Sequence, residues 1–115
     1  MAGLNDHIVP WENAYRSARV FGARTRFVLS TSGHIQSLIN PPGPNSRSSF
    51  RVAETLPASE DEYLASVPTV SGSWWPDWTA WLSERSGERK RAPTRPGNTQ
   101  YKPTGKAPGG YVHAA

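Results

Sequence analysis

The sequence predicts a piece of an α/β domain, one that is incomplete by itself. Three observations lead to this prediction: an amphipathic helical pattern over residues 11–21, a single short hydrophobic strand at residues 26–30, and two short helical patterns after it. A lone hydrophobic strand leaves backbone groups unpaired on both edges and therefore needs a sheet to join. For the same reason we expect the isolated chain to be partly folded or prone to aggregation.

The first helix is predicted from apolar residues that recur at a spacing of three and four. Pro10 suits the first helical position, and Gly22 supplies a stop at the far end. The apolar positions are Trp11, Ala14, Tyr15, Ala18 and either Val20 or Phe21.

The strand is predicted from the β-branched and aromatic run of residues 26–30, which lies between Gly22 and Ser32-Gly33. His34 follows its carboxyl end, in the kind of loop where open α/β sheets place their chemistry. Residues 1–7 read as a short polar loop that ends on Asp6 and His7.

After the strand we expect one helical turn at residues 35–39, a stop in the proline- and glycine-rich stretch 40–45, and a polar connector. Short helices are predicted over residues 60–67 and 74–84, separated by a break at residues 70–72. Ser73 is the expected N-cap of the second of these helices, with Pro76 in its first turn and Gly87 after its end.

Charge and composition divide the chain into residues 1–87, part of the α/β domain, and residues 88–115, a basic tail rich in proline and glycine. Residues 85–115 hold seven basic side chains and one acidic one, so they carry all of the excess positive charge. The tail could attract an anionic surface or simply keep the chain soluble. It carries no recognition motif, so nucleic acid binding is not favoured.

Several classes of protein are disfavoured by composition. The chain has no run of about 20 apolar residues and no pattern typical of a signal peptide, so we expect no membrane span and a cytoplasmic location. It has no cysteine, which excludes disulfides, thiolate metal sites and a cysteine nucleophile within these 115 residues.

Asp6 and His34 are the candidate catalytic residues. Both lie in predicted loops, with a helix and a strand between them. An aspartate can accept a hydrogen bond from one imidazole nitrogen, which leaves the other nitrogen free to take a proton from a nucleophile. By spacing alone, such residues are more often a helix cap and a surface loop residue.

Several blocks of sequence around these residues occur in the same order in a known family, the polyhydroxyalkanoate (PHA) synthases, which this chain resembles over nearly its whole length. Separate tryptophan-rich blocks are more specific than a single short motif. The blocks are Asp6-His7-Ile8-Val9-Pro10-Trp11, Ser32-Gly33-His34-Ile35, Ile39-Asn40-Pro41-Pro42-Gly43, Gly72-Ser73-Trp74-Trp75-Pro76-Asp77-Trp78, Trp81-Leu82-Ser83-Glu84-Arg85-Ser86-Gly87 and Ala107-Pro108-Gly109-Gly110-Tyr111-Val112.

The resemblance implies the C-terminal fragment of an α/β-hydrolase fold, namely its last strand and flanking helices. It assigns Asp6 and His34 to a Cys-Asp-His triad in an acyltransferase that polymerises (R)-3-hydroxyacyl-CoA and releases CoA. His34 would be the base, and Asp6 would either support it or help to activate the 3-hydroxyl group. The CoA thioester is the substrate and no cofactor is implied. The cysteine of the family's G-x-C-x-G elbow lies outside these residues, and no G-x-S-x-G replaces it.

The resemblance also implies partners: the growing PHA chain, the surface of the PHA granule, and the missing N-terminal synthase part or another synthase subunit. Gln36-Ser37 and the tail resemble synthases of medium-chain monomers, which leaves the monomer length open. A rival interpretation is a non-catalytic module that binds a synthase or a granule through its tryptophan helix and basic tail.

Two further features have more than one interpretation. His7 could join Asp6 and His34 in a metal site, but three histidines without close paired spacing argue against zinc, and a loop-orienting role is favoured. Trp74, Trp78 and Trp81 share one helical face. An aromatic stripe of this kind more often packs in a core than stacks on a sugar or a nucleic acid.

Overall fold

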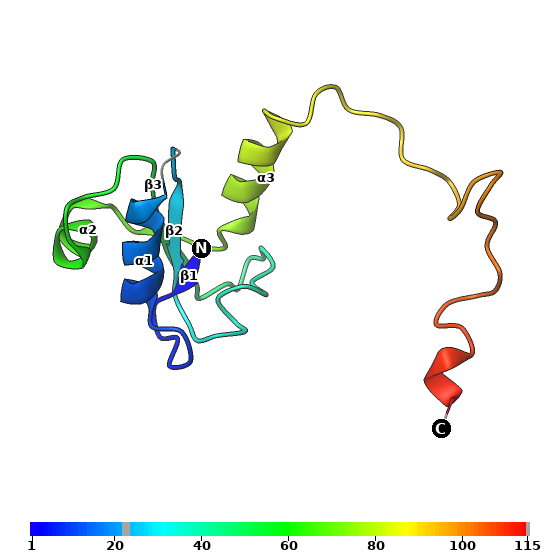
Figure 1. Ribbon diagram of the computed structural model, residues 1–115, viewed down its shortest axis with the longest axis horizontal. Helices are drawn as coiled ribbons and strands as arrows, with labels where there is room; N and C mark the ends of the chain where they lie inside the picture. Colours follow the sequence, from blue (N-terminus) through cyan, green and yellow to red (C-terminus); the bar gives the residue numbers. More distant parts are fainter. Residues whose placement is uncertain (22–23, 115) are drawn as a thin grey trace. The chain divides into compact units, whose positions relative to one another are not determined.

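The computed structural model describes residues 1–21 and 24–114, which fall into two units, Met1–Arg85 and Ser86–Ala115. The first unit is a small mixed sheet with helices packed around it (Figure 1). The predicted α/β class is therefore confirmed. The predicted stop at Gly22 lies outside the described residues.

The sheet has four strands in the order β1-β2-β3-β4, so the prediction of a lone strand is wrong. β1 (Ala2–Gly3) runs parallel to β2 (Phe27–Ser30), with Ala2 opposite Leu29. β3 (Ser49–Ala53) and β4 (Val70–Ser71) extend the sheet with antiparallel pairing. The hydrophobic strand thus finds partners on both edges within the chain itself.

The three strands that the sequence analysis did not predict differ in the strength of their sequence signal. Residues 49–53 form β3 and not the predicted polar connector; their first four side chains alternate between polar and apolar, and Phe50 is buried. This period of two is the ordinary signal of a half-buried strand. β1 and β4 have only two residues each, which is too short for any periodic pattern, so only their pairing reveals them.

The core lies between α1 (Trp11–Val20) and one face of the sheet. Trp11, Tyr15 and Ala18 are the buried residues of α1, as the helical spacing predicted. The ring of Tyr15 meets Phe27 edge to face, with centroids 5.1 Å apart, and Tyr63 of α2 (Glu60–Ser66) is fully buried beside them. Aromatic contacts of this geometry add to the free energy gained by burial.

The helices begin within one residue of the predicted starts, but the predicted capping roles of Pro10 and Ser73 differ, since Trp74 holds the N-cap position of the last helix. α1 begins at Trp11, so Pro10 occupies the N-cap position instead of the predicted first helical position. The amide of Glu62 donates to the Ser59 hydroxyl oxygen at 3.2 Å, which caps α2. α3 (Trp75–Ser83) begins one residue later than predicted, with Pro76 in its first turn.

α3 is attached to the sheet by an ion pair. Arg26, just before β2, donates two hydrogen bonds of 2.7 Å to the carboxylate of Asp77. Glu54, just after β3, lies 3.4 Å from the same guanidinium. The hydrogen bonds to Asp77 are the main cause that raises the pKa of Arg26.

The second unit, residues 86–114 as described, holds a single 3-10 turn, η1 (Tyr111–His113), and its side chains are exposed. Within the described ranges 1–21 and 24–114, none of the helices has the length and apolar character needed to cross a membrane.

Candidate functional site

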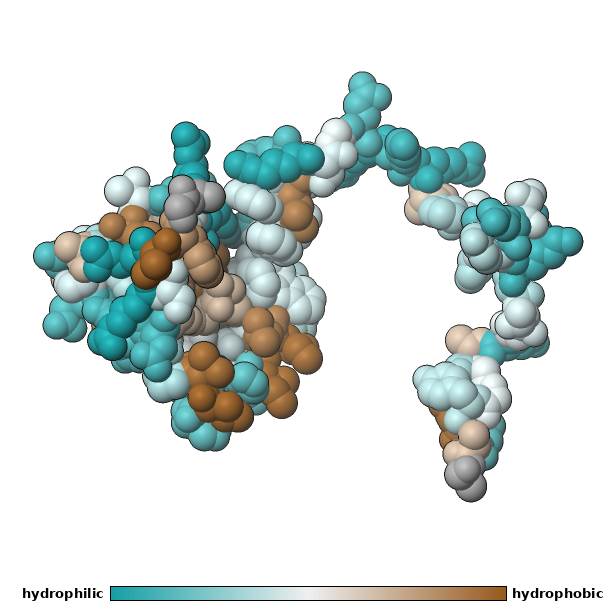
Figure 2. All heavy atoms as spheres, in the orientation of Figure 1, coloured by the Kyte–Doolittle hydropathy of each residue, from teal (hydrophilic) through white to brown (hydrophobic). Residues whose placement is uncertain are grey.

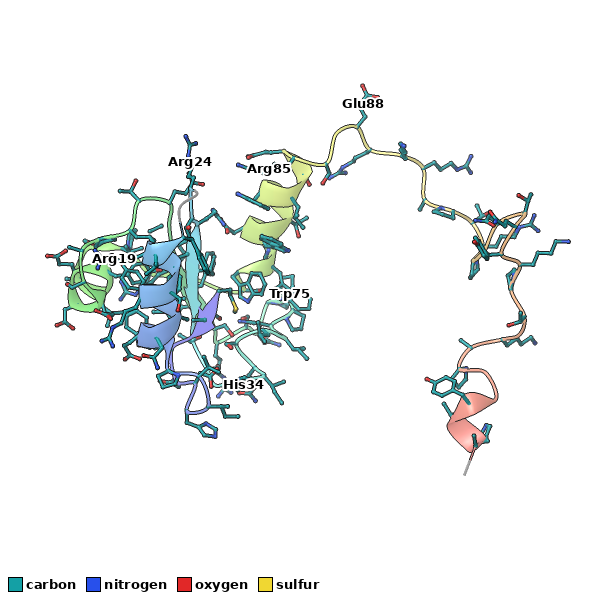
Figure 3. The ribbon with its side chains drawn as sticks, in the orientation of Figure 1. Arg19, Arg24, His34, Trp75, Arg85 and Glu88 are labelled. Atoms are coloured by element: carbon teal, nitrogen blue, oxygen red, sulfur yellow. The ribbon has the colours of Figure 1, made fainter. Side chains whose placement is uncertain are left out.

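Asp6 and His34 meet in the loops at the carboxyl ends of β1 and β2. Asp6 lies three residues after β1, and His34 lies four residues after β2. The parallel pairing of these strands brings their carboxyl ends together. His34 Nδ1 is 2.8 Å from Asp6 Oδ2, although 28 residues separate them in the chain. The structure therefore brings the two candidate catalytic residues into direct contact. His34 lies in the loop that follows β2 (Figure 3).

The carboxylate of Asp6 is fixed by the start of its own loop. Its Oδ1 atom accepts hydrogen bonds from the amides of Ile8 at 2.9 Å and Val9 at 3.0 Å, and only 8% of the side chain is exposed. These bonds, that to Val9 first, and the contact with His34 lower the pKa of Asp6, although desolvation opposes them. The carboxylate is therefore ionised at neutral pH, with one oxygen held by the backbone and the other facing the imidazole.

This arrangement determines which ring nitrogen of His34 carries the proton that points toward Asp6. An ionised carboxylate can only accept, so Nδ1 carries the proton and donates it to Asp6 Oδ2. In the neutral ring the opposite nitrogen, Nε2, then has a free lone pair, and the side chain is 42% exposed. This is the arrangement of a general base that is oriented by a carboxylate.

The backbone before His34 is in an uncommon conformation. Ser32 has a φ of +84°, in the left-handed region that most non-glycine residues avoid. Its carbonyl accepts a hydrogen bond of 3.1 Å from the amide of Asn5, which joins the loop after β1 to the loop after β2. Conformations of this kind are found preferentially at functional sites.

The turn after His34 packs against β1. The amide of Ser37 donates to the carbonyl of Gly33 at 3.0 Å, and the Ser37 side chain is only 1% exposed. Gly3 lies so close that a Cβ on it would be 2.7 Å from Ser37 Oγ. The predicted helical turn at residues 35–39 is thus a hydrogen-bonded turn that touches β1, the strand that precedes the loop of Asp6.

The start of α3 holds the same turn from the other side. The indole of Trp74 donates to the carbonyl of Ser37 at 2.8 Å, and that of Trp75 donates to the carbonyl of Leu38 at 2.9 Å. The Ser73 hydroxyl donates to the carbonyl of Asn40 and also accepts from the amide of Trp75 at 3.0 Å. Sequence reasoning did not find these positioning contacts. The paired tryptophans before Pro76 were the only visible signal.

The other candidates take no part in this cluster. His7 is exposed, and the Asp6 carboxylate accepts from two amides of its loop, so the loop-orienting role of His7 stays a prediction. His113 lies in the second unit. Within residues 1–21 and 24–114, no group of three or more histidine, cysteine or acidic side chains is arranged to hold a metal ion.

The tryptophan stripe lies on the first unit without being buried by it. Trp74, Trp78 and Trp81 line one side of a groove of about 480 Å³, with Met1 and Val28 among the residues on the other side. The rings of Trp78 and Trp81 are stacked at 5.0 Å, yet Trp78 is 40% exposed. Within this chain, the predicted core packing of the stripe is therefore only partial.

Comparison with known proteins shows similarity to one group of enzymes, and no family model matches the chain. Poly(3-hydroxyalkanoate) polymerase 1 of Ectopseudomonas oleovorans is 47% identical over 113 residues, which are 98% of this chain and 20% of the relative. The poly(3-hydroxyalkanoate) polymerase subunit PhaC of Cupriavidus necator is 48% identical over 95% of this chain and 18% of the relative. The corresponding polymerase of Methylorubrum extorquens is 35% identical over 97% of this chain and 18% of the relative. The chain thus spans about a fifth of the length of these relatives.

Proposed function

Because this chain is homologous to a C-terminal portion of poly(3-hydroxyalkanoate) polymerases, we propose that it supplies the aspartate and the histidine of a polymerase active site. The observation that carries the proposal is the 2.8 Å hydrogen bond between His34 Nδ1 and Asp6 Oδ2. Two residues 28 positions apart are held in the geometry that a histidine base requires.

The first step of the proposed reaction loads an acyl group. His34 Nε2 removes the proton of a cysteine thiol that the rest of the polymerase supplies. The thiolate attacks the thioester carbonyl of an (R)-3-hydroxyacyl-CoA and forms a new carbon–sulfur bond, the bond to the CoA sulfur breaks, and the departing thiolate recovers the proton from His34.

Chain growth follows the same pattern. His34 removes the proton of a 3-hydroxyl group, the resulting oxygen nucleophile attacks the enzyme thioester, an oxoester forms, and the cysteine thiolate takes the proton back. Asp6 stabilises the imidazolium in both steps. Its two oxygens are already engaged by the backbone and by His34, which favours support of the base over activation of the hydroxyl.

The nucleophile has to come from outside these residues. The sequence contains no cysteine. Two of the hydroxyls near His34 have structural partners: Ser30 donates to the carbonyl of Thr31, and Thr31 Oγ1 accepts from the amide of Ser49 at 3.0 Å. We therefore expect no turnover by this chain alone. Sustained CoA release by the purified chain that disappears in both His34→Ala and Asp6→Ala variants would overturn this expectation.

The surroundings of the site suit an aliphatic substrate. Ile8 follows Asp6 and is 61% exposed, and Ile35 and Ile39 follow His34 and are 65% and 66% exposed. Figure 2 shows apolar surface over the loops that follow β1 and β2. These side chains form an apolar surface that can contact an acyl-CoA, a growing polyester chain or the surface of a polymer granule in the cytoplasm.

A chimera tests the catalytic proposal. In full-length polymerase 1 of E. oleovorans, this chain replaces the matching segment, and CoA release from 3-hydroxyacyl-CoA is followed. We expect the His34→Ala and Asp6→Asn variants to lose activity by about 10²–10⁴-fold, the usual contribution of a positioned base. His7→Ala and Asp61→Asn are matched controls and should keep the parent rate. Undiminished activity in the first two variants would refute the proposed roles.

A second candidate function is a non-catalytic module that binds a synthase or a granule. The exposed Trp78 and the basic residues 86–114 favour it. The same chimera discriminates between the two functions, because a module without a catalytic role would leave the rate of the His34→Ala variant at that of the parent.

A further inference from the structure

The second unit contains a hollow of its own, with a volume of about 570 Å³. This volume falls in the range of roughly 300–1,000 Å³ that is usual for sites that bind small molecules. Tyr101, Lys102 and Lys106 line the hollow together with several glycines, and none of the described residues that line it is acidic. The hollow therefore combines an aromatic ring with two cationic side chains.

A short turn fixes the position of Tyr101. Asn98 Oδ1 accepts hydrogen bonds from the amides of Gln100 at 2.9 Å and Tyr101 at 2.7 Å, and the amide of Asn98 donates to the carbonyl of Tyr101 at 2.9 Å. Gly97 has a φ of +80°, and a Cβ on it would lie 2.5 Å from the Tyr101 carbonyl oxygen, so the turn needs a glycine there. The chain reverses its direction at this turn (Figure 1). Tyr101 remains 68% exposed, so its ring is available to a ligand.

The chemistry of the hollow suits a ligand with a planar base and several phosphates. A tyrosine ring can stack on a nucleic acid base, and lysine ammonium groups donate hydrogen bonds to phosphate oxygens. Glycines in the lining let a phosphate approach the backbone amides closely. Among residues 1–21 and 24–114, neither Lys102 nor Lys106 forms an ion pair with an acidic side chain, so both charges are available.

The loops that carry the candidate pair have no cation for such phosphates. Residues 4–9 and 31–40 contain no lysine or arginine, and their exposed side chains include the apolar Ile8 and Ile35. An acyl-CoA has an aliphatic acyl end, which suits these loops, and a nucleotide end that carries several negative charges. The nucleotide end needs basic residues elsewhere, and residues 85–115 hold seven of them with one acidic residue.

We propose that the hollow of the second unit binds the 3′-phosphoadenosine diphosphate end of an acyl-CoA. The adenine stacks on Tyr101, and the phosphates bind Lys102 and Lys106. The inference rests on the proposed function, because that function makes an acyl-CoA the substrate. Both units belong to one chain, so binding of the nucleotide by the second unit raises the concentration of acyl-CoA around the polymerase.

The test titrates the complete 115-residue chain with CoA by isothermal titration calorimetry. We expect weaker binding of dephospho-CoA, which lacks the 3′-phosphate, and no binding of pantetheine, which lacks the nucleotide. Lys102→Gln combined with Lys106→Gln should weaken the binding of CoA by about fivefold or more, because both charges line the hollow. Lys90→Gln combined with Arg91→Gln removes the same charge outside the lining and should change the affinity by less than about twofold.

A second pair of variants tests the stacking contact. Tyr101→Ala should weaken the binding of CoA by about fivefold or more. Tyr111→Ala is the matched control, because Tyr111 is 78% exposed but does not line the hollow, and it should bind CoA as the parent does. Equal losses in the two charge variants would show diffuse attraction by the tail and overturn the site. Binding of pantetheine as tight as that of CoA, or tighter binding of ATP, would overturn the assignment to CoA.

The chimera separates this inference from the catalytic proposal. There Lys102→Gln combined with Lys106→Gln should raise the KM for 3-hydroxyacyl-CoA by about the factor by which it weakens the binding of CoA. Binding of CoA by a chimera that releases none from its substrate would refute only the catalytic proposal. An active chimera whose KM is the same with and without the two lysines would refute only the nucleotide site.

Discussion

A substitution at Gly3, which contacts Ser37, tests whether the packing of β1 against the turn after His34 maintains the site. A Cβ on Gly3 would lie 2.7 Å from Ser37 Oγ, 2.9 Å from Ser37 Cβ and 3.0 Å from the carbonyl oxygen of Ser32. Ser37 is 1% exposed and Ser32 is held by the backbone of Asn5, so neither neighbour can move aside cheaply. Overpacking of this kind costs about 1–3 kcal/mol.

A smaller effect opposes this cost. Replacing glycine by alanine restricts the unfolded chain, which stabilises a protein by about 0.4–1 kcal/mol. We therefore expect Gly3→Ala to lower the free energy of unfolding by about 1–2 kcal/mol net. For a unit of this size that corresponds to a fall in melting temperature of roughly 5–15 °C. The four-stranded sheet removes the argument for partial folding that rested on a lone strand, so we expect the first unit to unfold in a cooperative transition.

The assay is urea or thermal unfolding of the chain followed by far-ultraviolet circular dichroism. Gly43→Ala is the matched control, because a Cβ there meets nothing within 4 Å, and it should be neutral or slightly stabilising. Adding Ser37→Gly to Gly3→Ala removes both close atoms and should restore part of the loss. Equal stability of the two alanine variants would refute the reasoning. In the chimera, Gly3→Ala should also slow CoA release, since the displaced turn carries His34.

Three further predictions concern the contacts that position the site. The pKa of Asp6 is lowered in the folded state, so the stability that its carboxylate contributes is present above about pH 3.9 and is lost as pH falls through the lowered pKa. Nuclear magnetic resonance signals of the amides that bind the carboxylate should show this loss, and unchanged signals would contradict the prediction. Arg26→Lys removes the paired hydrogen bonds to Asp77 and should lower the free energy of unfolding by about 1 kcal/mol, a modest loss because the ion pair is partly exposed. A urea unfolding curve equal to the parent's would show that the ion pair contributes nothing to stability. Trp75→Phe removes the indole hydrogen bond to the Leu38 carbonyl but keeps an aromatic ring at the position, and should lower stability by about 1 kcal/mol and reduce CoA release by the chimera. An unaltered rate would mean that this bond does not position the turn.

Local patterns were sufficient for the helices and the central strand. The spacing of Trp11, Tyr15 and Ala18 predicts the buried face of α1, and the run at residues 26–30 predicts β2. Each element depends on residues that are close in sequence, so a short window contains the whole signal. The alternation of residues 49–52 is likewise a local signal, and it indicates β3 where the polar composition predicts a connector.

Local sequence patterns do not predict the geometry of the site. β1 has two residues, and its place beside β2 depends on a pairing partner 27 positions away. The contacts of Trp74 and Trp75 with the turn after His34 join residues 37 positions apart. No window along the chain contains both members of such a pair, and many arrangements of the same elements satisfy the same local preferences.

Local sequence patterns predict the helices and the central strand, and the blocks around Asp6 and His34 identify the candidate pair and the likeness to the polymerases. The parallel pairing of β1 with β2, and the hydrogen bond by which Asp6 accepts from Nδ1 of His34, are seen only in the folded chain. The physical reason is that helices and hydrophobic strands arise from neighbouring residues. A catalytic geometry arises from loops that meet only when distant strands pair, and here Gly3 must let Ser37 approach before the two loops can meet.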